Sequence, residues 1–310
     1  MAKTHTPVVG SRAFKDWDRR SAVRSRPYQY CLSSRDLAVL EPERWYPTCL
    51  CPALQLEELR CLPSSSRLTA HIAHLVHFLD YTTSLELTVV NECVASITLG
   101  DLKRYFTSTD QRMALLLYTD EGYHASFSRK IADQVSEHFN LARYPSMRLS
   151  RLNDYLKKAP ENYRYIAVFL VAFVSETVIT KELLDLTRLQ LIEPVFNMLR
   201  DHLHDEARHA IFFSGCLAKL LPQLSESEKA FTAHALSDIL EIFFRPDREF
   251  LAALFGQDSF HFNIIIEQLE SVIKERLPQV AAPTLLAIQR STLLEDRVHR
   301  ELFRKRGLLP

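Results

Sequence analysis

The feature that most constrains this chain is a short motif, Asp-Glu-x-x-His, which the sequence contains twice. The copies are Asp120–His124 and Asp205–His209, and they hold the only two Asp-Glu pairs in the chain. Residues three and four apart share one face of an α-helix, so His202 joins Glu206 and His209 in a stripe of two imidazoles and a carboxylate. Iron and manganese accept this set of ligands. The repetition argues against coincidence and predicts a metal site built on helices.

Composition excludes several other kinds of protein. Lys and Arg together number 38, as do Asp and Glu, so the charge balance gives no basis for binding nucleic acid or an acidic membrane. The 310 residues include only six Gly, which suits long helices and argues against a turn-rich β fold or a Gly-rich phosphate loop. With 47% hydrophobic and 25% charged residues, the chain has the composition of an ordinary globular protein.

Nothing in the sequence predicts secretion or membrane insertion. The N-terminal stretch Met-Ala-Lys-Thr-His-Thr-Pro contains no apolar signal segment. The most apolar run, Tyr165–Val174, has ten residues, about half of what a bilayer requires. The six Cys are scattered, and Cys49 and Cys51 lack the spacing of a zinc site. We therefore expect a cytoplasmic protein with free thiols and no membrane partner.

Residues 1–63 differ from the rest of the chain. Five Pro fall between Pro27 and Pro63, and Pro resists helix interiors. The segment also carries apolar aromatic side chains, namely Trp17, Tyr28, Tyr30 and Trp45. These features predict an extended N-terminal arm packed on the main domain, with a flexible tail as the alternative. Residues 64–310 are then expected to form a single helical domain.

From residue 64 onward the hydrophobic pattern is helical, and no strand-like alternation competes with it. Ser, Pro and Gly residues mark the helix ends, and Ser108 with Gln111 predicts a capping box. Four long helices are expected to form a core over residues 64–221, and they span about 64–97, 108–138, 160–187 and 194–221. A fifth helix is capped by Ser225 and Glu228 and stopped by Pro246. Shorter C-terminal helices are expected at 247–255, 260–277 and 284–305.

The two motif helices alone leave a dinuclear site incomplete, since such a site in a four-helix bundle also takes one Glu from each of the other helices. Glu176 is the candidate on the third helix. It follows an apolar run, where a lone carboxylate is costly unless it meets a cation or an ion-pair partner. The first helix offers Glu86 and Glu92, which lie about 240° apart on a helix. Only one of them can face the site, and the apolar neighbours of Glu86 favour it.

Asp120 and Asp205 each precede the His of their own motif by four residues. We expect each carboxylate to accept a hydrogen bond from the imidazole nitrogen that does not bind metal, which would orient His124 and His209. A solvated helix Asp is the alternative. The other histidines considered are expected outside the metal site, and they are His71, His74, His77, His138, His204, His234, His261 and His299.

In order and approximate spacing, seven residues resemble the metal ligands of the di-iron N-oxygenases typified by p-aminobenzoate N-oxygenase, the AurF type. They are Glu86, Glu121, His124, Glu176, His202, Glu206 and His209. The resemblance covers about residues 65–215. Its most discriminating residue is the third His, His202, because most ferritin-like relatives use two. The resemblance selects Glu86 over Glu92 and implies an all-α, ferritin-like four-helix bundle with a dinuclear metal site.

The resemblance also implies a chemistry and its partners. Two Fe ions, for which Mn could substitute, would bind O2 as a bridged peroxide and transfer oxygen to the nitrogen of a small amine. The amine would be aromatic or derived from an amino acid, and the product a hydroxylamine, nitroso or nitro compound of specialised metabolism. Electrons would come from an external reductase. Tyr81 stands where an Arg could clamp a substrate carboxylate, which argues against p-aminobenzoate itself. We expect a homodimer.

Two other functions fit the same bundle. The first is a di-iron C–H hydroxylase, desaturase or aldehyde-processing oxidase, which the third His disfavours. The second is a ferritin-like metal store. A store usually consists of a short four-helix unit, whereas this chain has about 150 residues outside its predicted core.

Overall fold

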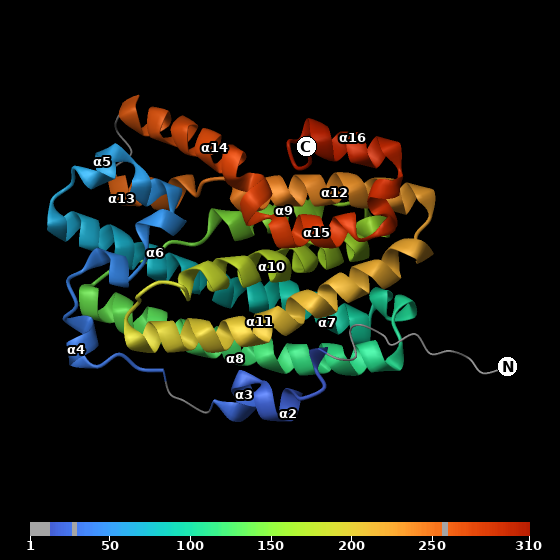
Figure 1. The fold of residues 1–310 in the computed structure, drawn as a ribbon, viewed down its shortest axis with the longest axis horizontal. Coiled ribbons are helices and arrows are strands. Elements are labelled where there is room, and N and C mark those ends of the chain that lie inside the picture. Colours follow the sequence, from blue (N-terminus) through green and yellow to red (C-terminus); the bar gives the residue numbers. More distant parts are fainter. Residues whose placement is uncertain (1–12, 27–29, 256–259) are drawn as a thin grey trace.

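The computed structural model describes residues 13–26, 30–255 and 260–310, and all regular structure within these ranges is helical. The four predicted long helices are present and lie side by side (Figure 1). They are α6 (Ser64–Leu85), which continues through a π-helical turn (Glu86–Val90) into α7 (Asn91–Thr98), then α8 (Ser108–Phe139), α10 (Arg164–Leu186) and α11 (Glu193–Leu220). The all-α prediction is confirmed.

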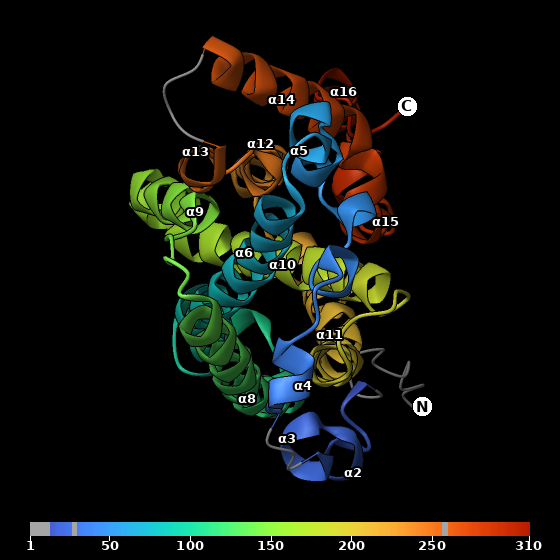
Figure 2. The same ribbon diagram turned by 90° about the vertical axis from the view of Figure 1, so that its left-hand side faces the viewer.

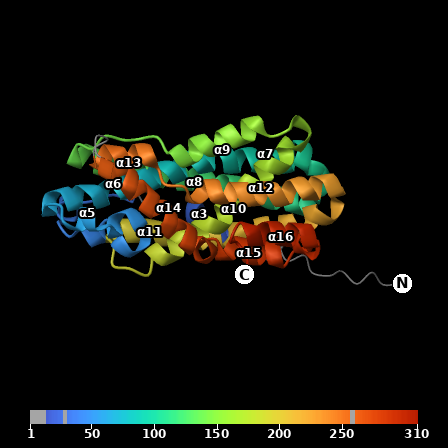
Figure 3. The same cartoon turned by 90° about the horizontal axis from the view of Figure 1, so that it is seen from above.

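Shorter helices cover this bundle on several sides. They are α2 (Trp17–Arg20), α3 (Ala22–Ser25), α4 (Ser34–Leu37), α5 (Glu57–Arg60), α9 (Met147–Lys158), α12 (Glu226–Phe244), α13 (Arg248–Phe255), α14 (Phe260–Val280), α15 (Ala282–Gln289) and α16 (Arg297–Lys305). In Figure 2, α8 and α11 lie on the side of α2 and α3, α6 and α10 lie in the middle, and α12 to α14 lie on the far side. Figure 3 shows α12 running between α9 on one side and α15 and α16 on the other.

Helix α10 explains why the bundle needs these covering helices. Every side chain from Ile166 to Ile179 is buried, so this helix is enclosed around its whole circumference. Helix α11 packs along one side of it, while α12 and α15 pack along others. The predicted C-terminal helices therefore complete the core instead of forming a separate unit.

The first long helix is interrupted where it reaches the predicted site. Its π-helical turn begins at Glu86 and ends at Val90. A π turn inserts one extra residue into the helical repeat and changes which side chains face inward beyond it. Glu86 is 4% exposed, whereas Glu92 is exposed to solvent. The choice of Glu86 as the inward carboxylate is consistent with this burial.

Two capping boxes and one additional helix can be compared with the predictions. The reciprocal capping box of α8 joins Thr107 to Asp110, so the predicted pair one residue later was wrong. Overlapping patterns in this Thr- and Ser-rich stretch allow both pairs, and only Asp110 brings a carboxylate. The capping box between Ser225 and Glu228 at α12 is confirmed. Helix α9 was not predicted, because only Leu152 and Leu156 of its side chains are buried.

The described residues of the N-terminal region, 13–26 and 30–63, do not form the predicted extended chain. Between residues 13 and 63 the described chain forms short helices and 3-10 turns, several with Pro in the first turn, where its missing N–H does no harm. Trp45 is fully buried and packs edge-on against Phe139, and Tyr30 is also buried. Tyr28 lies outside the described residues. The division of the chain into an arm and a domain at residue 63 stays a prediction.

Cys31, Cys49, Cys51, Cys93 and Cys216 are free thiols. Within the described residues, none of the helices is both long enough and apolar enough to cross a membrane.

The histidines of α6 pack within the structure. His71 and His74 are buried and bond to backbone carbonyls, and His77 lies 3.3 Å from Asp247. Burial lowers the pKa of His74 from 6.5 to about 4, although its bond to the Ala70 carbonyl opposes the shift. The side chain of His261 lies outside the described residues.

We expect His74 to make the fold sensitive to acid. Between pH 6.5 and 4, His74 binds a proton in the unfolded chain but not in the folded chain. The free energy of unfolding is therefore highest above this range and falls as the pH drops through it. The loss is about 3 kcal/mol at most. In urea unfolding across this range, His74→Gln should flatten the pH dependence, and the exposed-residue control His138→Gln should not. An unchanged slope in His74→Gln would show that other groups carry the acid sensitivity.

Candidate metal centre

The seven predicted ligands converge at the centre of the bundle. They come from all four long helices, and all are buried, namely Glu86, Glu121, His124, Glu176, His202, Glu206 and His209. The structure therefore brings together side chains that lie more than 120 positions apart in the sequence. None of the seven faces solvent.

Six of these residues form two overlapping groups, each with the geometry to hold a metal ion. In one group, ligand atoms of Glu86, His124, His202 and Glu206 all lie within 4.8 Å of one another. In the other, those of Glu121, His124, Glu206 and His209 do so. Both groups include His124 and Glu206, as expected for a dinuclear centre.

Short contacts between side chains define each of the two ligand groups. At one end, Nε2 of His202 lies 3.0 Å from Oε1 of Glu86 and 3.2 Å from Oε1 of Glu206. At the other end, Nδ1 of His209 lies 2.8 Å from Oε1 of Glu121. Glu176 completes this end, with its Oε2 3.4 Å from the same nitrogen.

Many of these converging atoms lie close to one another but have no hydrogen-bond partner in favourable geometry. Among them are both carboxylate oxygens of Glu121, Oε2 of Glu86, Glu176 and Glu206, Nδ1 of His124 and Nε2 of His202. An unpartnered buried charge costs several kcal/mol. Four carboxylates carry up to four negative charges, which two divalent cations would balance. The donor set therefore fits a pair of metal ions.

Like charges and burial spread the pKa values of the carboxylates far apart. Burial raises the pKa of Glu86 to about 7, against the opposing effect of His202. Burial and the charge of Glu206 raise the pKa of Glu176 well above its usual range. For Glu206 itself, burial is outweighed by the charge of His209 and by hydrogen bonds, which hold its pKa well below its usual range. Without cations, the raised pKa values favour protons on Glu86 and Glu176.

A second layer of carboxylates orients two of the imidazoles. Nε2 of His124 lies 3.0 Å from Asp205, and Nε2 of His209 lies 3.3 Å from Asp120. The pairing predicted within each motif was therefore wrong, because each Asp serves the His of the other helix. Helices α8 and α11 run in opposite directions (Figure 1), so the two copies of the motif face each other and exchange contacts. This arrangement leaves Nδ1 of both imidazoles facing the carboxylates.

A cavity of about 240 Å³ lies along the bundle from the site, and none of the seven predicted ligands lines it. Its lining includes Tyr81 of α6 and Lys181 of α10, five residues before Glu86 and five after Glu176. Five residues span about 7.5 Å of helix. Because α6 and α10 run in opposite directions (Figure 1), both residues lie on the same side of the metal ligands. The cavity therefore begins about 7.5 Å along the helices from the ligands.

An arginine that the sequence analysis missed reaches this cavity. The guanidinium of Arg148, on α9, lies 4.5 Å from the centre of the Tyr81 ring and 3.8 Å from Glu182. The hydroxyl of Tyr81 is buried and has no hydrogen-bond partner. Tyr81 occupies the position considered for a clamping Arg, and the packing of a distant helix brings Arg148 beside it. Only the placement of α9 reveals it.

The geometry agrees with what comparison of the sequence shows. The sequence matches the family model described as p-aminobenzoate N-oxygenase AurF over residues 39–257, which is more than half of the chain. The chain belongs to the AurF family. Membership indicates an oxygenase on a ferritin-like bundle, and the matched range includes all seven converging residues and Arg148. A comparison with curated proteins found no match.

Removing one carboxylate should stabilise the metal-free AurF-family bundle. Glu176 adds a fourth carboxylate to a site that is already acidic, so Glu176→Gln should raise the free energy of unfolding of metal-free protein at pH 8 by about 1–3 kcal/mol. Glu92→Gln, on the exposed side, should change it little. Chemical denaturation measures both. A destabilised Glu176→Gln variant would instead mean that Glu176 acts in a favourable ion pair with His209.

Proposed function

We propose that this protein is an O2-dependent di-iron N-oxygenase that acts on a small amine. The observation that carries the proposal is the pair of overlapping ligand groups, which are buried and short of hydrogen-bond partners. A cavity lies about one and a half helical turns away along α6 and α10. Membership in the AurF family supports the same reaction. Manganese suits the same ligands, so the choice of iron rests on the family chemistry.

The residues divide naturally between two ions. One ion would take Glu86 and His202, and the other Glu121, Glu176 and His209. His124 and Glu206 lie within reach of both. When bound, the two ions would supply the redox chemistry that activates O2.

The overall reaction sets the partners that the protein needs. An amine R–NH2 with O2, two electrons and two protons gives R–NH–OH and water. One oxygen atom forms the new N–O bond and the other leaves as water. We propose that a separate reductase supplies the electrons. Further rounds would give nitroso and nitro products, and a homodimer working in a specialised-metabolite pathway in the cytoplasm stays the expected context.

The cavity is the proposed amine site. Its volume of about 240 Å³ exceeds the roughly 150 Å³ of a cavity that holds benzene, so a single-ring amine or an amino acid fits. A molecule spanning the distance from Tyr81 to Glu86 would place its nitrogen at the metal ligands. Its far end would then meet Arg148 and the Tyr81 hydroxyl, which suit an acidic group. Apolar side chains such as Phe78 and Phe250 also line the cavity and would contact the body of the amine.

Metal binding and oxygen chemistry test the proposal directly. We expect metal-free protein to take up two Fe(II) per chain without O2. On stopped-flow mixing with O2, a visible absorption band should form and decay faster with an arylamine or amino acid than with an alkane. Glu206→Ala, which removes a residue common to both groups, should lose at least one ion, while Glu92→Gln should keep both.

Three results would contradict the proposal. Absence of stoichiometric metal in the wild-type protein would remove the ligand assignment. Quenching by alkyl substrates only would favour a C–H oxidase. Rapid formation of ferric mineral by a particle of cage size on gel filtration would favour metal storage.

We expect Arg148 to select amines that carry an acidic group. Losing one charge-assisted hydrogen bond costs about 1.5–3 kcal/mol, so Arg148→Met should raise KM for such amines roughly 10–100-fold. It should leave turnover of a neutral arylamine nearly unchanged. Arg151→Met is the control, because Arg151 lies on the same helix and bonds to the carbonyls of Arg245 and Pro246. An equal loss for acidic and neutral amines would show that Arg148 only supports the fold.

A further inference from the structure

A short N-terminal strap, defined as residues 14–25 with helices α2 and α3, lies against the metal centre. It crosses α8 and α11 on the face of the bundle opposite α12 (Figure 2). The strap lies outside the range 39–257 that matches the AurF family model. Phe14, Ser21 and Ala22 are its buried residues.

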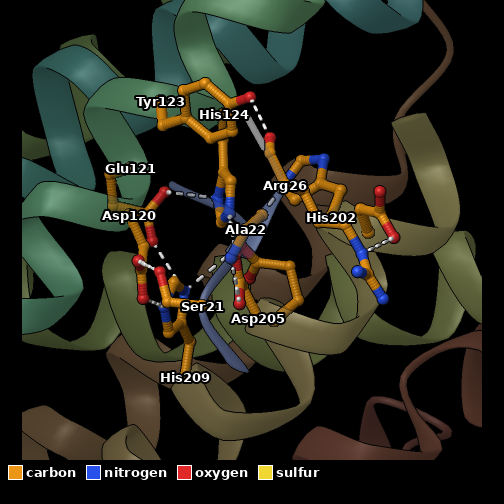
Figure 4. Close-up of polar contacts among 12 residues, drawn as sticks. Ser21, Ala22, Arg26, Asp120, Glu121, Tyr123, His124, His202, Asp205 and His209 are labelled. Atoms are coloured by element: carbon orange, nitrogen blue, oxygen red, sulfur yellow. Dashed lines mark hydrogen bonds and ion pairs between the residues drawn. The ribbon is translucent and has the colours of Figure 1, made fainter. Parts of the chain in front are cut away.

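Two strap side chains bind Asp120, the carboxylate that orients His209. Nε1 of Trp17 donates to both oxygens of Asp120 at 2.9 Å. The hydroxyl of Ser21 donates to Oδ1 at 2.5 Å. Figure 4 shows Ser21 between the strap backbone and Asp120, with His209 beyond. Phe14 also stacks over the His209 ring, with centroids 6.0 Å apart.

The next residue of the strap binds Asp205, the carboxylate that orients His124. The backbone N–H of Ala22 donates to Oδ2 of Asp205 at 3.0 Å, and Arg208 also pairs with this carboxylate. Ser21 is extended, with φ −62° and ψ 139°, where α2 ends and α3 begins. The side chain of this extended residue therefore reaches Asp120, and the backbone amide of the next residue reaches Asp205 (Figure 4).

The C-terminal end of the strap is held by neighbouring contacts. The hydroxyl of Tyr123 donates to the Arg26 carbonyl at 2.7 Å. The side chain of Arg26 lies 3.7 Å from Asp201, which also accepts a hydrogen bond from Tyr30. These contacts tie the chain to α8 and α11 immediately after the strap.

We propose that the strap is a positioning element of the metal centre, acting through Trp17, Ser21 and the amide of Ala22. Donors from the strap hold each carboxylate where its oxygen can accept the Nε2 proton of an imidazole. An imidazole that donates from Nε2 leaves the lone pair of its Nδ1 for metal. The strap thereby fixes the tautomer and direction of His209 and His124. This inference rests on the metal site of the proposed function.

Ala22→Pro is the sharpest variant for testing this role. Ala22 is the first residue of α3, a position where Pro is tolerated. The extended backbone of Ser21 suits a residue that precedes Pro. The substitution therefore removes one N–H donor while the helix can still form. Ala22→Gly keeps the donor and is its matched control.

Trp17→Phe with Ser21→Ala removes the donors to Asp120 and retains most of the packing. Arg20→Ala is the control for this pair, because Arg20 is an exposed strap residue. In the 310-residue chain, Co(II) serves as the probe, with affinity measured by competition titration and coordination by its visible ligand-field bands. We expect Ala22→Pro and the double variant to bind Co(II) roughly 10–100-fold more weakly, with shifted bands. Both controls should match the wild type.

The outcomes separate this proposal from the proposed function. The positioning role would be overturned, and the metal site would stand, if the folded variants kept wild-type Co(II) affinity and bands and showed only a lower melting temperature. A wild-type chain that takes up no Co(II) or Fe(II) would overturn both. If Ala22→Pro does not fold, the double variant decides, and Trp17→Phe alone decides if that also unfolds.

Discussion

The structure depends on the cost of holding four glutamates at the centre of an apolar bundle. Glu86, Glu121, Glu176 and Glu206 have almost no access to solvent, and each has a carboxylate oxygen without a hydrogen-bond partner. Hydrophobic packing of the surrounding helices must compensate for this arrangement when no cations are present. The stability of the fold and the chemistry of its site are therefore opposed, which is typical of functional centres.

The duplicated motif needs only a few residues to orient its own imidazoles. Because α8 and α11 are antiparallel, each motif supplies a glutamate and an imidazole to the centre and an aspartate to the other helix's imidazole. Hydrogen-bond donors of the N-terminal strap in turn bind those aspartates. Such layered hydrogen bonding fixes a buried imidazole more firmly than the packing of its own helix could.

The cavity shows how the covering helices add specificity to a general metal scaffold. Its wall near the site comes from α6 and α10, while Arg148 and Phe250 come from α9 and α13. Changes in those outer helices can reshape the cavity and its charge without moving any of the seven converging residues. The bundle and the proposed substrate cavity can therefore vary separately.

The sequence by itself determined the helical fold, the two motifs with His202 and the fifth helix, because periodicity, capping residues and the spacing within each motif are local. The choice of Glu86 over Glu92 rested on the resemblance to a known family. The sequence also placed Glu176 in the interior, since its apolar neighbours surround the helix. Only the tertiary structure decided the rest. The exchange of Asp120 and Asp205 between helices, the approach of Arg148 to Tyr81 and the contacts of Trp17, Ser21 and Ala22 each join segments far apart in the chain. Their positions follow from packing, which leaves no periodic signal in the sequence.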